Sequence, residues 1–574
     1  MIKSFIATLA LYVISPLLWA GPAQDFDNLL AQHWQQAQQE KIFFRTDPDA
    51  WKPQGKLADL SPQGFTRRQQ FNQKMLTELA AIPMNELDKA RQISYRVFEY
   101  ERQTEASSYQ FQDRYFPINF LSGWHTYFAE APANMAFLSA ADYDQYLVSL
   151  ADYPRFNQQN IDLLKQGVAH GFVQHCETFK DYQQTISAHI VDSAKDSAWY
   201  EPFTRFPAQF SPRQKQDYQQ KGQALITQAV LPAYNHLLQY FVEQYMPHCR
   251  AQAGISSVEG GEEYYAYAVN YYTTTDLTPK QIHQLGLDEV ERIYQQMQGI
   301  IKQVGFSGSY QEFLHFLATD PQFYAQDPQD LLEKTAFITQ KMYGKLPSLF
   351  ATLPRNTFAI KESASRGAFY MPPPDNRTPG TYFLSSIPAR QPLYNLEALS
   401  LHEAVPGHHL QNAISMELDV PEFRRTLNHS AFSEGWGLYS ERLGKEAGFY
   451  QDPYSDFGRL GYEMWRAVRL VVDTGIHVFG WSRQQAIDYL ASRTALTPQA
   501  TADQIDRYIS WPGQALSYKI GELKIRELRA KARQQLGANF DLRAFHDVII
   551  GQGSLPMAVL EDVVNDWITG QKQP

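Results

Sequence analysis

Cysteine is nearly absent from this sequence: the 574 residues include only two, Cys176 and Cys249. Two thiolates are too few for a zinc site built from cysteine. The pair could form a disulfide in an oxidising compartment, but the sequence does not show whether the two lie close together. No cysteine stands near the N-terminus, which excludes attachment of a lipid to a thiol there.

Runs of basic residues are missing as well. The net charge is −10, and no stretch of Lys and Arg is long enough to follow a phosphate backbone. Nucleic acid is therefore not expected as a partner. Hydrophobic residues make up 44% of the chain and charged residues 20%, proportions that are typical of a folded globular protein rather than a disordered one.

Long apolar segments are absent beyond the N-terminus. There, a positive Lys3 precedes a short apolar stretch at 5–19, followed by small residues, the layout of a secretory signal peptide. A membrane anchor is the alternative, but a spanning helix needs roughly 20 apolar residues, and Pro16 interrupts this stretch. We therefore expect a signal peptide over residues 1–20 and a periplasmic or secreted mature chain over 21–574, with no stable membrane insertion after cleavage.

Signals for helix starts recur along the chain. Ser or Thr followed by Gln three residues later stands at 211–214, 278–281 and 482–485, which is the capping-box pattern. Apolar residues then recur near a 3.6-residue spacing, so that 278–303 is predicted to be one long helix. The clearest strand signal, at 366–388, is typical of a hairpin. The sequence predicts a mainly α fold: a single helical domain, of one or two lobes around a cleft, with a small β-hairpin or sheet.

A metal-binding pattern is interrupted in the segment 401–411, LHEAVPGHHLQ. In a His-Glu-x-x-His helix two histidines on one face hold a zinc ion, and the Glu takes a proton from the bound water. Here the fourth residue after His402 is Pro406, which cannot bind a metal. In a regular helix His408 would point about 120° away from His402, and His409 would lie about 10 Å along the axis. Neither could then share an ion with His402.

Pro406 and Gly407 predict that the helix is irregular at this point. Proline has no N–H to give to the carbonyl group of His402, and its ring crowds that turn. A bulge over residues 405–407 would absorb two extra residues and bring His408 to the place of the second histidine. The alternative is that these histidines are supporting or surface residues and that the similarity to a zinc helix is accidental.

A third ligand is expected in the segment 431–443, AFSEGWGLYSERL, which holds two acids on one helical face. In single-zinc peptidases with a glutamate ligand, that residue comes from a following helix, roughly two to three dozen positions after the first histidine. Glu434 lies 32 residues after His402 and is the predicted ligand. Glu441 is the alternative ligand, or an acceptor that holds a histidine ring; it could also lie on a solvated helix face, paired with Arg442 or Lys445.

The two segments together resemble a large bacterial family, domain of unknown function 885. Its hallmark is His-Glu-x-x-Pro-Gly-His followed by Phe-x-Glu-Gly-Trp, and the residues that match are His402, Glu403, Pro406, Gly407, His408, Phe432, Glu434, Gly435 and Trp436. Further stretches that resemble the family are 271–287, 380–384, 469–477 and 511–521. The resemblance implies a thermolysin-like zinc peptidase with one Zn²⁺ ion, and a helical body around a deep cleft like that of M3-type oligopeptidases. It also favours His408 over His409 as ligand.

Polar residues on one stripe of a later helix are candidates for supporting roles. Arg469, Asp473 and His477 recur every four residues among apolar neighbours. Asp473 could accept the second N–H of a zinc histidine, and His477 could face substrate. A structural ion pair between Arg469 and Asp473, with a satisfied core histidine, is the alternative.

Candidate substrate contacts lie in the hairpin and near the C-terminus. Tyr518 could donate a hydrogen bond to the oxyanion of amide hydrolysis, and Gln514 stands four residues before it. Lys519 or Arg526 could bind a substrate carboxylate; a solvated helix of mixed charge is the alternative. The strand with Tyr382 could be an edge along which an extended peptide pairs, or part of a plain hairpin.

The sequence thus predicts a zinc hydrolase of short peptides in which His402, His408 and Glu434 hold one Zn²⁺ ion. Glu403 would act as the base. The other predicted residues are Tyr518 and His477 in catalysis, Asp473, Glu441 and His409 as supports of the ligands, and Tyr382, Gln514, Lys519 and Arg526 in substrate binding. A hydrolase of non-peptide amides and a non-catalytic peptide-binding protein are the alternatives, although the intact Glu403 argues against the latter.

Overall fold

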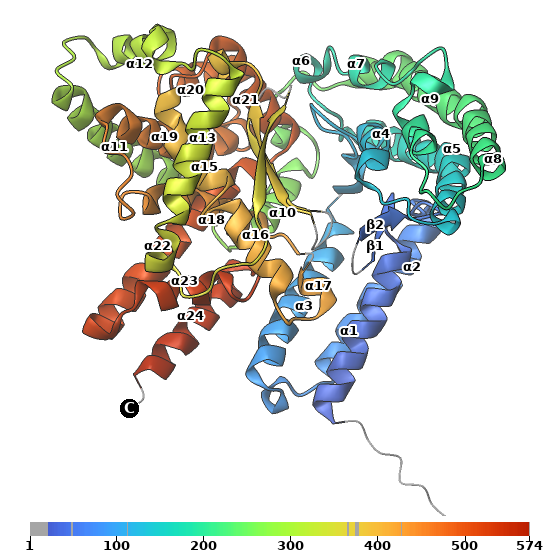
Figure 1. Ribbon diagram of the computed structural model, residues 1–574, viewed down its shortest axis with the longest axis horizontal. Coiled ribbons are helices and arrows are strands. Elements are labelled where there is room, and N and C mark those ends of the chain that lie inside the picture. The colour runs from blue at the N-terminus through green and yellow to red at the C-terminus, as the bar shows by residue number, and fades with distance from the viewer. Residues whose placement is uncertain are drawn as a thin grey trace, which may run out of the picture.

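The computed structural model is mainly α, as the sequence predicts (Figure 1). The residues it describes are 21–47, 50–111, 113–363, 367–373, 378–425 and 427–572. The signal peptide predicted at 1–20 lies outside the described residues. Within them, no helix has the length and apolar character needed to cross a membrane.

The first three long helices form the lower part of the molecule next to the C-terminal helices (Figure 1). They are α1 (Pro22–Gln39), α2 (Pro62–Ala80) and α3 (Lys89–Ser108), and the strands β1 (Phe44–Asp47) and β2 (Ala50–Pro53) pair antiparallel between α1 and α2. Phe26 and Phe98 from these helices share one hydrophobic core with Trp436 and Leu560, far along the sequence. Helices from the two ends of the described chain therefore share one core, in which α3 packs against α24 (Met557–Gln571).

A second core gathers aromatic and aliphatic side chains from residues 43–245 alone. Its helices, at the upper right of Figure 1, are α4 (Trp124–Asn134), α5 (Ala140–His170), α6 (Cys176–Phe179), α7 (Gln183–Ser187), α8 (Pro212–Leu225) and α9 (Leu231–Tyr240). The capping box predicted at 211–214 is present at the exposed start of α8, because Ser211 Oγ accepts from the Gln214 backbone N–H and Gln214 Oε1 accepts from the Ser211 backbone N–H.

The remaining helices form the larger body on the left of Figure 1. Those that precede the sheet are α10 (Gly261–Thr273), α11 (Pro279–Gln303), α12 (Tyr310–Thr319), α13 (Pro328–Tyr343) and α14 (Leu346–Leu349). Those that follow it are α15 (Leu396–Glu403), α16 (His408–Glu417), α17 (Glu422–Arg425), α18 (Ser430–Leu443), α19 (Pro453–His477), α20 (Arg483–Ala491), α21 (Pro498–Ser510), α22 (Ser517–Leu536), α23 (Leu542–Ile550) and α24 (Met557–Gln571). The long helix predicted at 278–303 is α11, with Thr278 as its N-cap. It packs along α19, while α18 packs along α22.

The predicted hairpin is present, with one strand more than expected. The strands β3 (Phe358–Ser363), β4 (Phe369–Met371) and β5 (Gly380–Ser385) form a sheet in the order β3–β5–β4. Because β5 pairs parallel with β3 and antiparallel with β4, both of its edges are occupied. The prediction that this strand is a free edge for a peptide was therefore wrong, and Tyr382 at its centre is fully buried.

The two cysteines form a disulfide, Cys176–Cys249, which closes a loop over a sequence separation of 73. The loop contains α6 to α9, and thus much of the second core. Beside the disulfide, the guanidinium group of Arg250 donates to the carbonyl oxygens of Val173, Ala253 and Ile509. The crosslink therefore lies where the second core meets α21.

Replacing both Cys176 and Cys249 with Ser is expected to lower the free energy of unfolding by roughly 4 kcal/mol, because the unfolded chain then regains the freedom of a long closed loop. Thermal unfolding followed by circular dichroism measures the change. A reductant should lower the midpoint of the wild type and leave that of the double variant unchanged. Equal midpoints for the disulfide-bonded wild type and the double variant would show that the crosslink adds no stability.

Candidate metal centre

A break between two helices brings His402 and His408 together. His402 lies in the last turn of α15, and His408 is the first residue of α16. Between the helices, Ala404 (φ −99°, ψ −105°) and Gly407 (φ −75°, ψ −129°) leave the helical conformation. The imidazole rings end 4.7 Å apart, centre to centre, and almost perpendicular at 88°. The predicted irregularity is thus a full interruption rather than a bulge inside one helix.

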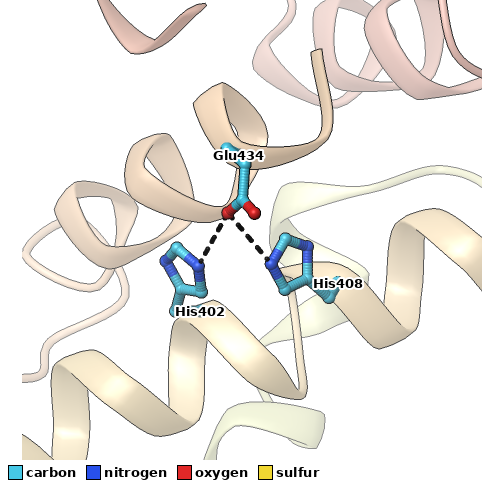
Figure 2. A group of neighbouring side chains, drawn as sticks. All are labelled: His402, His408 and Glu434. Carbon is cyan, nitrogen blue, oxygen red and sulfur yellow. Dashed lines mark ion pairs between the residues drawn. The ribbon is translucent and has the colours of Figure 1, made fainter. Parts of the chain in front are cut away.

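Glu434, on α18, completes the cluster by pointing between the two rings (Figure 2). Its Oε2 atom lies 3.6 Å from His402 Nε2 and 3.5 Å from His408 Nε2. All three ligand atoms fall within 4.8 Å of one another, and no other such group of His, Cys, Asp or Glu occurs in the described part of the chain. Tetrahedral ligands at about 2.1 Å from a zinc ion lie about 3.4 Å from each other, so the spacing fits one ion.

The His402 ring is oriented by Glu441, which lies on α18 about two turns after Glu434. His402 Nδ1 lies 2.8 Å from Glu441 Oε1 and donates to it, which leaves Nε2 directed towards Glu434. A carboxylate behind a ligand histidine fixes its tautomer and makes the ring a better donor to a metal. Arg466, from α19, lies 3.5 Å from the same carboxylate oxygen. The sequence offered no signal for Arg466, since its partner comes from a different helix.

Negative charge dominates this cluster and favours a cation within it. Burial disfavours a charged imidazole, but the interactions with Glu434 and Glu441 outweigh it and raise the pKa of His402 to about 10. Burial likewise opposes ionisation of Glu434, but the two histidines hold its pKa well below the usual value. A divalent cation would meet the same demand for positive charge that the proton on His402 meets. Two nitrogen donors and one carboxylate form a set that suits zinc.

Glu403 stands next to the first ligand, as the last residue of α15, with its side chain buried. Burial is the main cause that raises its pKa, while His402 and His408 act in the opposite direction. A carboxylate in such a position can accept a proton from water near the ion.

Two glycines and one tryptophan allow α18 to lie close to the His402 ring, to α22 and to the helix break. A Cβ atom on Gly437 would lie 2.7 Å from Cε1 of the His402 ring, and one on Gly435 would lie 2.5 Å from Gly521 on α22. Trp436 Nε1 donates to the carbonyl oxygen of Pro406 at 2.8 Å and so ties α18 to the helix break. The Glu-Gly-Trp part of the motif therefore holds the ligands in place, a role that the sequence analysis did not assign.

Comparison with known proteins identifies the family. The sequence matches the family described as bacterial protein of unknown function (DUF885) over residues 45–564. The chain belongs to the DUF885 family. No curated protein matches its sequence.

Two solved structures resemble this DUF885 protein along nearly their whole length. A "putative lipoprotein" from Colwellia psychrerythraea is 29% identical, with a TM-score of 0.88 over 96% of this chain and 100% of that one. A "putative lipoprotein of unknown function" from Shewanella oneidensis is 17% identical, with a TM-score of 0.65 over 95% and 99%. An M32 carboxypeptidase from Deinococcus radiodurans is 11% identical over 87% and 95%, and its TM-score of 0.33 is too low to carry an argument.

The structure overturns the roles predicted for Asp473 and His477 in this DUF885 protein. His477 is fully buried; its Nδ1 accepts from the backbone N–H of Ile255, and its Nε2 donates to the carbonyl oxygen of Tyr508. It therefore does not face substrate. Asp473 accepts from the hydroxyl group of Tyr265 rather than from a zinc histidine, and that position belongs to Glu441.

Lys519 cannot bind substrate as predicted, because it is fully buried among carboxylates. Its Nζ lies 2.8 Å from Glu289 and 2.9 Å from both Glu463 and Glu522. Arg526, the other candidate, is paired with Glu522 at 3.1 Å. Its role in binding substrate stays a prediction.

The other predicted residues lie near the ligands or behind them. The Tyr518 ring is stacked near His402, with the ring centres 6.5 Å apart. Gln514 accepts at 2.6 Å from Arg507, which also lies 3.3 Å from the Tyr518 hydroxyl group. His409 is turned towards the sheet, where its Nδ1 lies 3.1 Å from the Tyr370 hydroxyl group. His408, not His409, thus belongs to the cluster.

The change Glu441→Gln is expected to weaken zinc binding roughly 10- to 100-fold, because the amide keeps the shape of the side chain but loses the charge that polarises His402. Competition with a chromophoric chelator measures the affinity. Glu446→Gln is the matched control, since Glu446 contacts Arg529 rather than a histidine. Unchanged affinity in Glu441→Gln would remove Glu441 from the site.

A methyl group at position 437 should weaken metal binding by displacing His402, without destabilising α18 itself. Alanine in a helix interior is normally favoured over glycine by up to about 1 kcal/mol, but here its Cβ would push the His402 ring out of place. Gly437→Ala is therefore expected to lose zinc, as measured by metal analysis after dialysis. Gly461→Ala, in α19 with nothing within 4 Å of the added carbon, should bind zinc as the wild type does. Normal zinc content in Gly437→Ala would contradict the observed packing.

Proposed function

We propose that this protein is a zinc-dependent hydrolase that cleaves peptide bonds in short peptides. The convergence of His402, His408 and Glu434 on one point carries this proposal (Figure 2). Glu403 follows His402 directly and interacts electrostatically with all three side chains. Three protein ligands leave a position open at a zinc ion, which is the usual arrangement of a catalytic rather than a structural site. When bound, zinc supplies a Lewis acid that polarises a carbonyl group and makes nearby water more acidic.

The side chains around the ligands would carry out the proton transfers. Glu403 takes a proton from the attacking water and later passes it to the leaving amine. Tyr518 stands within reach of the ligand cluster and donates to the oxyanion that forms on the carbonyl. Glu441 holds His402 in the tautomer that presents Nε2.

An extracytoplasmic location fits the same protein. Disulfides such as Cys176–Cys249 persist in oxidising compartments and are rare in the cytosol. The predicted signal peptide indicates export as well. The similar protein from Colwellia psychrerythraea is described as a "putative lipoprotein", which is compatible with the same location.

The change Glu403→Gln tests this function. The variant should keep its zinc, since none of the three ligands changes, and lose roughly 10²- to 10⁴-fold in turnover because the general base is gone. Metal analysis reports the zinc, and mass spectrometry of a peptide-library digest reports the cleavage. Glu417→Gln, a partly exposed acid paired with Arg355, is the control and should digest the library normally. Full turnover in zinc-loaded Glu403→Gln would rule out the mechanism.

A further inference from the structure

Two arginines beside the metal centre form no ion pair with an acid among the described residues, although Arg469 opposes the effect of burial on the pKa of Asp473 and lowers it. The first, Arg469 on α19, is buried. Its Nε donates to the Tyr508 hydroxyl group at 2.9 Å, while no hydrogen-bond partner meets its Nη1. The Tyr518 ring covers its guanidinium group at 4.3 Å. Asp473, one turn further along α19, accepts hydrogen bonds from other groups instead.

The second arginine, Arg507 near the end of α21, is only half buried. Its Nη2 contacts the neutral side chains of Gln514 (2.6 Å) and Tyr518 (3.3 Å). The hydrogen bonds described for Arg507 both use Nη2, and among the described residues no carboxylate forms an ion pair with it. Burial lowers the pKa of Arg507, while Tyr518, Tyr508 and Glu434 raise it. Since a guanidinium group carries five N–H donors in a planar fork that matches a carboxylate, most of the binding capacity of Arg507 is free.

Tyr518 contacts both arginines and also lies next to the ligand cluster. One face of its ring is stacked near His402, with 6.5 Å between ring centres, and Arg469 lies 4.3 Å from the same ring. Its hydroxyl group contacts Arg507. An extended peptide advances about 3.5 Å per residue, so one or two residues lead from a bond held at the metal to a group held at Arg507.

Arg469 is buried and Arg507 is half-buried, so both positive charges have lost part of their contact with water, which is costly without a partner. A ligand carboxylate that forms charge-assisted hydrogen bonds with a guanidinium group offsets this cost. We propose that Arg507 binds the free C-terminal carboxylate of the substrate, with Arg469 adding positive potential from behind Tyr518. The protein then removes one or two residues from the carboxyl ends of short peptides. Water adds to the scissile carbonyl, the C–N bond breaks, and a proton goes to the leaving amine. This inference rests on the proposed hydrolytic function.

The same guanidinium group could hold the carboxylate of an Asp or Glu side chain, so the substrate panel must separate the two sources. Four versions of one peptide separate the two. The first has a free C-terminus, the second an amidated C-terminus, the third a free C-terminus with an acetylated N-terminus, and the fourth an amidated C-terminus with Glu as the last residue. We expect amidation to lower kcat/KM roughly 100-fold, as the loss of a hydrogen-bonded ion pair does. N-terminal acetylation should have no effect, and the terminal Glu should not rescue the amide. Equal rates for acid and amide would overturn the inference; rescue by Glu would replace the C-terminus with an acidic side chain.

The change Arg507→Gln separates recognition from a structural role. For the free acid it should raise KM far more than it lowers kcat, whereas the slow rate with the amidated peptide should stay as in the wild type. Arg507→Lys should restore part of the affinity. Arg355→Gln, whose side chain is 88% exposed, removes the same charge elsewhere and should match the wild type. Equal losses on acid and amide in Arg507→Gln would mean that Arg507 only supports Tyr518, and would overturn the inference.

Binding without turnover keeps this inference distinct from the hydrolytic function. Calorimetric titration of the Glu403→Gln variant with the free-acid and amidated peptides should show tighter binding of the acid. Cleavage by the wild type without preference for a free C-terminus overturns the carboxylate site alone. Preference in binding with no cleavage of any peptide overturns hydrolysis alone, and the absence of both overturns both.

Discussion

The site depends on the interruption of one helix between Glu403 and His408. Six positions along a regular helix would turn the two histidines apart, and the four residues between α15 and α16 reverse that outcome. The interruption is held by Trp436 on the neighbouring helix α18, which donates to the carbonyl oxygen of Pro406. Because Trp436 belongs to the same helix as Glu434, one contact fixes the break and the third ligand together.

Charge balance is the second organising constraint. Glu434, Glu441 and Glu403 gather around His402, where Arg466 and the histidines oppose their negative charge. A cation is therefore favoured at the centre. Around Tyr518, by contrast, positive charge is in excess, because Arg469 and Arg507 both contact this residue. A peptide end offers both complements, a carbonyl oxygen for a metal and a carboxylate for an arginine.

A separate buried network joins the helices that surround the site. Lys519 on α22 contacts Glu289 on α11 and Glu463 on α19. Removing one member of such a network leaves an uncompensated buried charge, which costs about 3–5 kcal/mol. The network around Lys519 thus holds α11, α19 and α22 in fixed positions relative to one another. The prediction that Lys519 binds substrate was wrong because a lysine can serve either as a substrate contact or as a buried ion-pair partner, and only its surroundings decide which.

The sequence by itself determined the mainly α fold, the capping box of α11, the need for an irregular helix at Pro406, and the interval from His402 to Glu434. Each follows from local backbone chemistry or from spacing along the chain. The tertiary structure decided that Glu441 rather than Asp473 supports His402, that His477 and Lys519 are core residues, and that the strand of Tyr382 is central in its sheet. Periodicity shows which residues share a helix face or a strand, but not which distant element covers it, and that cover decides whether a polar side chain meets a ligand, a partner or solvent.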